Sequence, residues 1–559
     1  MTSDSAQNHH IEFRDLILLT VLLGIFFTLL PGNRSLSVPD EGRYAEISRE
    51  MAVTGDYLTP RLNGVKYFEK PPLFYWLEAA MIKLFGLGER TLRVWPSLLA
   101  LLGCLAVYTA GARLFDRRTG LISAAVLSTS LLYYALGRMI ILDMPVTALL
   151  SAALLSFLVG AHEPPGRSRR MFFYGFYLFA ALATLTKGLI GILIPGMVIG
   201  AWMLLMNEWR VLRTMHLLSG LALFLLIAAP WHILVSRANQ EFFNFYFIHE
   251  HFQRYLTKVH GRYKPAWYFI PILLAGFLPW SAFLFQAIRR SLPGSWKERR
   301  EHRGTVFLLL WTGLVFLFFS VSSSKLMPYI LPVFPPLSLL VGRYLADAWD
   351  RRDASDIAVG YAIFLVIALA LAGALVVLPR LAPGLDIQAL GVHRYTVAAT
   401  LASGAIIAWL FARARGYQRA FFVLLATTGL FITQLQMATP LLPTKSVKDL
   451  AATLKPLLQP GDEVVAYNMY YQDLPVYLER RITVVDWKGE MSFGTEVEDT
   501  RQWMIDNAEF LKRWQGPTTM YMLTEITTYD ALRKDSRCAL YPIARDRRNI
   551  LVSNKEVRS

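Results

Sequence analysis

Runs of roughly 20 apolar residues recur from the N-terminus to about residue 438 of this 559-residue chain. Each run is long enough to cross a hydrocarbon core about 30 Å thick as a single helix. Hydrophobic residues make up 54% of the sequence and charged residues only 18%, a balance that argues against a soluble protein with buried helices. The first run follows Arg14 and Asp15 with no small-residue cleavage site behind it, which predicts an anchor and not a signal peptide. The pattern predicts a polytopic α-helical membrane protein.

The apolar runs predict about thirteen transmembrane helices. Their approximate bounds are 14–31, 92–114, 119–136, 143–160, 171–186, 188–206, 213–235, 266–288, 303–321, 325–345, 355–378, 393–413 and 418–438. Arginines and lysines concentrate in alternate loops, such as 113–118, 167–170 and 289–303, and these loops are predicted to be cytoplasmic. The N-terminus is then inside, and an odd number of spans puts the C-terminus outside.

The formal net charge of +16 fits topogenic loops and affinity for anionic lipids. The sequence contains no nucleic-acid-binding motif, so we expect membrane lipids and not nucleic acid as partners. The only two cysteines, Cys104 and Cys538, do not suggest a disulfide framework or a cysteine-type metal site.

Polar composition divides the chain into two predicted domains. Residues 1–439 form the transmembrane domain, and 440–559 form a soluble outer α/β domain with strands near 464–467, 482–485, 520–523 and 550–552. Polar helices are expected near 446–457 and 499–514. The transmembrane domain has two long outer loops, 32–91 and 236–265, and the apolar patch 73–77 in the first of them is predicted to lie at the membrane interface.

Carboxylates occur close to the outer ends of two predicted spans. Asp40 and Glu41 follow Pro39 just beyond the first span, and Asp143 begins the fourth. Such carboxylates can orient a sugar, bind a cation or accept a proton. They can equally cap a helix start, and the residues alone leave both interpretations open.

Cations also gather on the predicted outer side. Lys70 precedes two prolines that stiffen the chain, and Lys187, Arg254 and Lys325 lie near other span ends. A fixed cation at this level suits a lipid phosphate, and the fork of an arginine matches phosphate oxygens. A lysine that extends its ammonium to the membrane surface is the alternative.

A metal site is a further possibility in the outer loops. The stretch His249-Glu250-His251 offers imidazole and carboxylate ligands, and Glu69 and His249 are the predicted ligands of a divalent metal such as Zn²⁺. No H-x-x-x-H pair or cysteine partner supports the site, so the sequence makes no cofactor certain and leaves a divalent metal as an open alternative.

These motifs, in this order and on one side, resemble the GT-C membrane glycosyltransferases. Within that class, residues 38–46 (VPDEGRYAE), 67–73 (YFEKPPL), 185–188 (LTKG) and 322–332 (SSSKLMPYILP) resemble the lipid A aminoarabinose transferases. Protein O-mannosyltransferases share the acidic pair, but the SKLMPY stretch favours the lipid A branch.

The resemblance implies a glycosyltransferase of the bacterial inner membrane that works at the periplasmic face. Its donor would be undecaprenyl phosphate carrying 4-amino-4-deoxy-L-arabinose, its acceptor a lipid A phosphate, and its product would confer resistance to polymyxin and cationic antimicrobial peptides. Transfer would invert the configuration at the anomeric carbon of the sugar. The implied catalytic residues are Asp40, Asp143 and Glu41, and the implied ligands of the substrate and lipid phosphate are Arg43, Tyr67, Lys70, Lys187, Arg254, Lys325 and Tyr329.

Two other functions compete with this one. A related enzyme could move a mannosyl group from a polyprenyl phosphate to protein hydroxyls. A secondary transporter could use charges within the membrane, but the charged residues collect at one face and no internal repeat is found.

Overall fold

The computed structural model describes residues 3–30, 32–253, 264–351, 355–382, 386–534 and 538–556. Its contacts divide the chain into two compact units. The first contains residues 1–33, 93–237 and 243–443, and the second contains 34–92, 238–242 and 444–559. The first outer loop therefore groups with the C-terminal region. The domain boundary at residue 439 remains a prediction.

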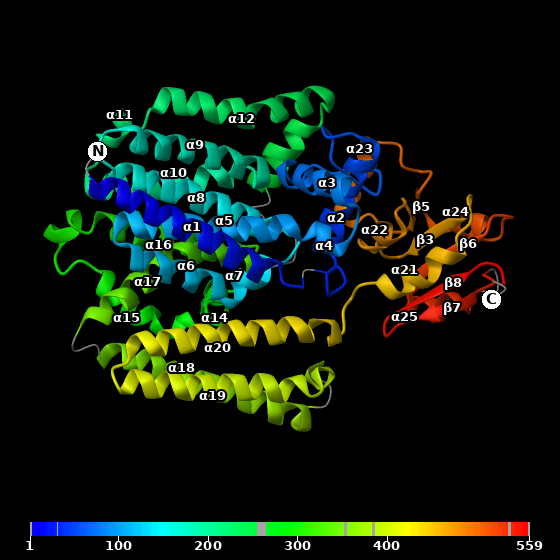
Figure 1. Cartoon of the computed structure of the whole chain (residues 1–559). Helices are drawn as coiled ribbons and strands as arrows, with labels where there is room; N and C mark the ends of the chain where they lie inside the picture. The colour runs from blue at the N-terminus through cyan, green and yellow to red at the C-terminus, as the bar shows by residue number, and fades with distance from the viewer. Residues whose placement is uncertain are drawn as a thin grey trace. The chain divides into compact units, whose positions relative to one another are not determined.

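The first unit is a bundle of long helices (Figure 1). Its α-helices are α1 (Ser3–Thr28), α5 (Val94–Leu114), α6 (Arg117–Thr129), α7 (Leu131–Leu136), α8 (Asp143–His162), α9 (Arg167–Lys187), α10 (Ile190–Met206), α11 (Val211–Thr214), α12 (Leu217–Ala238), α14 (Phe269–Gly276), α15 (Leu284–Ser291), α16 (Arg303–Val321), α17 (Phe334–Asp350), α18 (Ser355–Leu381), α19 (His393–Arg413) and α20 (Tyr417–Ala438). Shorter turns include the π-helix η1 (Asn244–Gln253) and the 3₁₀-helix η5 (Met327–Val333).

Each predicted span coincides with a helix or with two consecutive helices of this unit. Within the described ranges, eight helices are long and apolar enough to cross a membrane, or nine if the bent pair Ala266–Gly276 and Trp280–Ser291 is one span. The count of thirteen remains a prediction. Burial separates central from peripheral helices: 89% of the apolar window of α8 is buried, against 22% for α12 and α18, which leave most of their apolar side chains exposed.

Small residues allow the central helices to approach closely. A Cβ on Gly111 of α5 would lie 2.7 Å from the Cα of Gly120 in α6, and small residues are the usual way for membrane helices to pack. Asp116 starts α6 by accepting a hydrogen bond from the Thr119 backbone N–H at 2.9 Å. Helix α8 packs against both α5 and α9, and α18, α19 and α20 lie side by side (Figure 1).

The second unit combines the first outer loop with an α/β domain. The loop forms α2 (Asp40–Thr54), a hairpin of β1 (Arg61–Leu62) and β2 (Val65–Lys66), α3 (Leu73–Phe85) and α4 (Glu89–Leu92). The C-terminal region contributes α21 (Lys448–Leu454), β3 (Glu463–Tyr467), α22 (Leu474–Leu478), β4 (Thr483–Val485), α23 (Ser492–Val497), β5 (Met504–Ile505), α24 (Asn507–Trp514), β6 (Met520–Glu525), α25 (Ile526–Leu532), β7 (Tyr541–Arg545) and β8 (Asn549–Ser553).

Six strands form one sheet in the order β5-β4-β3-β6-β8-β7. Strands β3 to β6 are parallel, and the edge formed by β8 and β7 is antiparallel. The predicted α/β domain and its four strands are confirmed. The sequence missed the two-residue β5 and the exposed β7. A core that includes Val465, Phe510 and Met522 joins one face of the sheet to α24.

Candidate functional site

Three residues expected at the site meet in the helical unit. Asp143 is the first residue of α8 and Lys187 the last residue of α9, so the two antiparallel helices bring them to the same end. The Lys187 ammonium lies 2.6 Å from an Asp143 carboxylate oxygen. It also lies 4.9 Å from the ring centroid of Tyr329 in η5, a cation–π distance. The cluster presents one cation, one carboxylate and one phenol.

Lys325, in the same unit, is held by backbone carbonyl groups. Its ammonium donates hydrogen bonds to the carbonyl of Lys264 at 3.0 Å and to that of Ser322 at 2.5 Å, and the residue is buried. The bond to Lys264 joins the stretch before η5 to the residues just before α14. A snorkelling lysine would expose its ammonium, so that alternative does not describe Lys325.

In the second unit, Asp40 begins α2 and pairs with Arg43 one turn later. The guanidinium Nη1 lies 3.0 Å from Asp40 Oδ1, and Nη2 pairs with Glu490, a residue of the C-terminal region. The side chain of Asp40 is 51% exposed, whereas those of Arg43 and Glu490 are 11% and 12% exposed. The fixed arginine therefore holds a carboxylate that stays open to solvent. The pKa of Glu490 is raised by burial, with Arg43 opposing.

Glu41 faces the other way and is fully buried. Arg34 binds both of its oxygens, at 2.5 and 3.0 Å, and the backbone N–H of Ser37 donates to it at 2.8 Å. The Glu41 carboxylate therefore fixes the segment 34–37, which precedes α2. Of the adjacent acids, Asp40 is the accessible one.

Buried hydrogen-bond donors lie around Arg43. Among the described residues, the hydroxyls of Tyr67 and Tyr75 and the Nε of Arg43 are buried without a hydrogen-bond partner. Burial raises the pKa of Tyr67 well above its usual value, and the charge of Glu69 adds to the effect. The hydroxyl therefore stays protonated and can donate to an anionic oxygen. Such unpaired buried donors are typical of a binding site.

Glu69 and Lys70 follow this cluster in the chain. The Lys70 ammonium donates to the carbonyl of Glu69 at 2.8 Å, which curls the lysine back over its own backbone. Arg254 and the side chain of His249 lie outside the described residues, so the phosphate clamp and the metal pair stay predictions. Within the described part of the chain, no group of three or more His, Cys, Asp or Glu side chains is arranged to hold a metal.

Sequence reasoning missed Tyr75 and Glu490. Tyr75 lay in the patch predicted to rest at the interface, where an aromatic ring needs no other explanation. Glu490 gives no local signal, because its role depends on a partner in a distant part of the chain.

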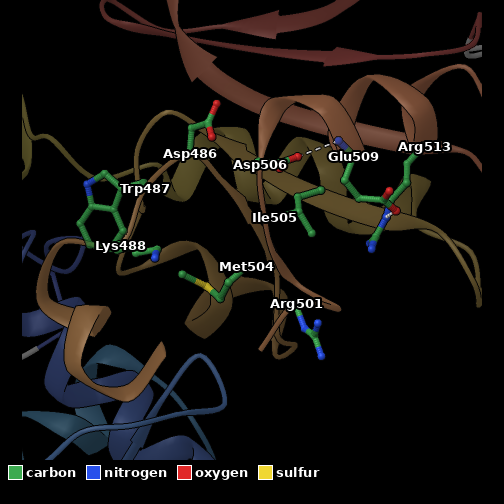
Figure 2. Close-up of a pocket in the computed structure, with 9 residues that line it drawn as sticks. All are labelled: Asp486, Trp487, Lys488, Arg501, Met504, Ile505, Asp506, Glu509 and Arg513. Atoms are coloured by element: carbon green, nitrogen blue, oxygen red, sulfur yellow. Dashed lines mark hydrogen bonds and ion pairs between the residues drawn. The ribbon is translucent and has the colours of Figure 1, made fainter. Parts of the chain in front are cut away.

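The C-terminal sheet carries a separate cavity of about 680 Å³ at the carboxyl ends of β4 and β5 (Figure 2). Trp487 and Lys488 line it from the loop after β4, and Glu509 and Arg513 from α24. None of the residues predicted from the sequence lines it. Its charged groups are largely paired within the domain, as Arg513 is with Glu509 at 2.8 Å.

Two family models match the chain. Residues 69–234 match the model described as dolichyl-phosphate-mannose-protein mannosyltransferase, and residues 450–554 match the aminoarabinose transferase C-terminal domain. The first match runs from just before α3 into α12, and the second covers most of the α/β domain.

The curated relatives that match this chain have one name in common. An undecaprenyl phosphate-α-4-amino-4-deoxy-L-arabinose arabinosyl transferase of Proteus mirabilis is 37% identical over 340 residues, 60% of each chain. The chain thus spans about three fifths of the length of that relative. The relative of the same name from Pectobacterium carotovorum is 31% identical over 513 residues, 88% of this chain and 89% of its own length.

Solved structures agree with these relatives. ArnT from Cupriavidus metallidurans, bound to undecaprenyl phosphate, matches with a TM-score of 0.86 at 31% identity, over 96% of this chain and 98% of that one. An oligosaccharyltransferase of Archaeoglobus fulgidus, at 13% identity and a TM-score of 0.51, shares the fold alone. The protein is therefore a multi-pass membrane protein of the GT-C fold, and it belongs to the family of undecaprenyl phosphate-α-4-amino-4-deoxy-L-arabinose arabinosyl transferases.

Proposed function

We propose that this protein moves 4-amino-4-deoxy-L-arabinose from undecaprenyl phosphate to a phosphate group of lipid A. The observation that carries the proposal is the likeness, over 96% of the chain, to an ArnT solved with undecaprenyl phosphate. The names of the curated relatives specify the same donor and sugar. Such a modification would lower the negative charge of lipid A and so reduce its affinity for polymyxin and other cationic peptides.

The proposed reaction exchanges one phosphate for another at the anomeric carbon. An oxygen of the acceptor phosphate forms a bond to that carbon, and the bond to the undecaprenyl phosphate oxygen breaks with its electron pair. Because the acceptor phosphate is already ionised at neutral pH, the step needs no strong general base. We propose that the exposed carboxylate of Asp40 orients the acceptor or binds the cationic amino group of the sugar.

The leaving undecaprenyl phosphate gathers negative charge as the bond breaks, and donors aimed at it stabilise the transition state. In the second unit, we assign this role to Arg43, Tyr67 and Lys70. The buried, unpaired hydroxyl of Tyr67 supports the assignment. In the helical unit, we assign donor binding to Lys187 and Tyr329, which meet at 4.9 Å, with Asp143 as the partner that fixes the lysine. Arg254 remains a proposed phosphate ligand.

We also propose that Glu69 and His249 bind a divalent metal such as Zn²⁺. A carboxylate and an imidazole are suitable ligands for this ion. Metal analysis of the purified protein, compared with Glu69→Ala, tests the assignment, and equal zinc content in both would contradict it.

The proposed location is the periplasmic face of the bacterial inner membrane. The arginine-rich loops support this orientation, because they mark the opposite side as cytoplasmic. Labelling of single cysteines in intact cells tests it: a cysteine placed at exposed Asp499 should react with an impermeant maleimide.

Transfer of radiolabelled sugar from undecaprenyl phosphate to lipid A, by the purified protein in detergent, tests the proposed function. The match of residues 69–234 to the mannosyltransferase model makes a protein acceptor the second candidate. Product with a mannosyl donor and a protein acceptor, alongside no product with lipid A, would favour that candidate.

A further inference from the structure

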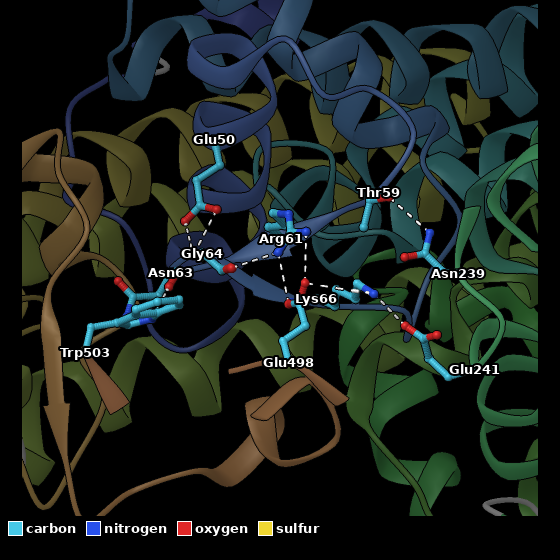
Figure 3. A network of polar contacts seen from close by, with 10 residues as sticks. All are labelled: Glu50, Thr59, Arg61, Asn63, Gly64, Lys66, Asn239, Glu241, Glu498 and Trp503. Atoms are coloured by element: carbon cyan, nitrogen blue, oxygen red, sulfur yellow. Dashed lines mark hydrogen bonds and ion pairs between the residues drawn. The ribbon is translucent and has the colours of Figure 1, made fainter. Parts of the chain in front are cut away.

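The β1–β2 hairpin binds two distant segments of the chain at once (Figure 3). Glu498 of the C-terminal region accepts two hydrogen bonds from the Arg61 guanidinium, both at 3.0 Å, and one from the Lys66 backbone N–H at 3.1 Å. The Lys66 ammonium lies 2.6 Å from an oxygen of Glu241. Residues 238–242 link α12 to η1, so the hairpin joins the C-terminal region to the beginning of the second outer loop.

The turn of this hairpin is itself built into the C-terminal sheet. Asn63 and Gly64 both have positive φ, 53° and 79°, as expected of a two-residue turn with the Asn-Gly sequence. The buried side chain of Asn63 donates to the carbonyl of Ile482 at 2.9 Å and accepts from the N–H of the same residue at 3.0 Å. The indole of Trp503 donates to the Asn63 carbonyl at 2.9 Å. A hairpin anchored in this way is a rigid base for Lys66.

Two further contacts hold the segment 238–242 against the first outer loop. The buried amide of Asn239 donates to the hydroxyl of Thr59 at 3.2 Å (Figure 3). The ring of Phe242, also buried, meets the ring of Phe68 edge-on with centroids 5.2 Å apart. Phe68 directly precedes Glu69 and Lys70. The segment is thus fixed beside two residues assigned to substrate or metal binding.

The Lys66–Glu241 pair is the charged contact between the hairpin and the segment 238–242, and the Lys66 ammonium also lies 3.9 Å from an oxygen of Glu498. The two side chains are only 16% and 24% exposed, so solvent screens their attraction less than on an open surface. Burial raises the pKa of Glu241, but the hydrogen bond from Lys66, a backbone hydrogen bond and the charge of Lys66 together outweigh it and leave that pKa below its usual value. The Glu241 carboxyl is therefore ionised at neutral pH.

We infer that Lys66 is a positioning residue for the proposed reaction: by pairing with Glu241 it fixes the beginning of the second outer loop against the hairpin. That loop continues through η1, which contains His249, to Arg254. The C-terminal region thereby contributes to the reaction, since Glu498 holds the strand that presents Lys66. It rests on the proposed function for its kinetic consequence, but its structural consequence can be measured independently.

The test uses the full-length protein in detergent and compares Lys66→Met, Lys66→Arg and Lys455→Met. The control pair, Lys455 and Glu479, has the same 2.6 Å separation, but its side chains are more than half exposed. Hydrogen–deuterium exchange of residues 239–253 measures how firmly the loop start is held. Initial rates at varied donor concentration give KM and kcat for sugar transfer.

We expect Lys66→Met to speed exchange in 239–253 and to raise the donor KM about tenfold, the size typical of losing a charge-assisted hydrogen bond, with kcat changed less than KM. Lys66→Arg should restore both, and Lys455→Met should match the wild type. Wild-type exchange and KM in Lys66→Met would overturn the inference. A lower kcat together with a lower thermal unfolding midpoint in Lys66→Met, neither restored in Lys66→Arg, would also overturn it. That result would show a purely structural role. If the wild type transfers no sugar, the proposed function fails, and exchange alone then decides whether Lys66 holds the loop.

Discussion

Arg43 contacts Asp40 and Glu490 with the two ends of one guanidinium: Nη1 lies 3.0 Å from Asp40 Oδ1, and Nη2 pairs with Glu490. A residue of the C-terminal region thereby sets the position of the arginine beside the exposed acid. Because Glu490 holds Arg43 independently of Asp40, Asp40 can be replaced without releasing the arginine.

The first prediction concerns Asp40. Replacement by asparagine keeps the size of the side chain but removes the charge proposed to orient the acceptor or bind the amino group. We expect sugar transfer to fall by about 100-fold or more, the range typical of a catalytic carboxylate, with an unchanged thermal unfolding midpoint. Asp499→Asn is the control, since that residue forms an exposed pair with Arg501. Full activity of Asp40→Asn would contradict the assignment.

The second prediction concerns Lys187. Its ammonium is shared between Asp143 at 2.6 Å and the Tyr329 ring at 4.9 Å. We expect Lys187→Met to raise the donor KM about tenfold, because a cation for the lipid phosphate is lost. Lys448→Met, which removes a half-exposed partner of Glu89, should leave KM unchanged. Donor titration of both variants checks the result, and equal affinities would exclude Lys187 from the donor site.

The third prediction concerns Tyr67. Its buried hydroxyl has no hydrogen-bond partner among the described residues, so Tyr67→Phe removes no protein contact. We expect unchanged or slightly higher thermal stability together with weaker donor binding. Tyr477→Phe should behave in the opposite way, because the Tyr477 hydroxyl accepts from the Leu36 N–H at 2.9 Å. Thermal unfolding and donor titration distinguish the two, and a loss of stability in Tyr67→Phe would show that its hydroxyl has a structural role.

Much of the fold could be predicted from local patterns. Apolar runs identify helices because a membrane leaves no other way to satisfy the backbone, and β-branched runs such as Thr483–Val485 identify buried strands. The Asn63-Gly64 turn also has a recognisable sequence, since Asn-Gly favours a two-residue hairpin turn. Local pattern cannot say which distant element a strand or hairpin will join.

The candidate site was predicted less completely for the same reason. Lys187 and Asp143 were recognisable because both lie at span ends on one side. Glu490 and Glu498 look like ordinary surface acids in the sequence, and only their pairing with Arg43 and Arg61 shows otherwise. The resemblance to known enzymes supplied the sugar and the lipid, which charge patterns alone do not specify.

The fourth prediction concerns Gly42 in the first turn of α2. A Cβ there would lie 2.7 Å from the backbone N of Asp473 and 2.7 Å from the carbonyl carbon of Gln472, and backbone atoms cannot move aside cheaply. We expect Gly42→Ala to destabilise the protein by about 1–3 kcal/mol and to lower activity through Asp40. Gly196→Ala in α10, where nothing lies within 4 Å of the new atom, is the control. Equal unfolding midpoints for the two variants would show that the helix start can shift.

The last prediction concerns Asp473 and pH. This carboxyl is fully buried; one oxygen accepts from Ser446 at 2.6 Å and from the Val447 N–H at 3.0 Å, and the other has no partner among the described residues. Burial raises its pKa from 3.8 to about 6, against the effect of these hydrogen bonds. The folded state therefore binds a proton more tightly than the unfolded state. Its contribution to stability is complete below pH 4 and is lost as the pH rises through about 6.

Asp473→Asn keeps an acceptor oxygen for Ser446 but cannot ionise. Relative to the wild type, the variant should gain stability between about pH 4 and 6, by an amount on the order of 3 kcal/mol for a shift of about two pKa units, and the gain should stay constant above that range. Thermal unfolding of both proteins in one detergent across this pH range measures the difference. A gain that is independent of pH would mean that the carboxyl does not titrate in the folded protein, and that the cost of its burial is met by its two hydrogen bonds.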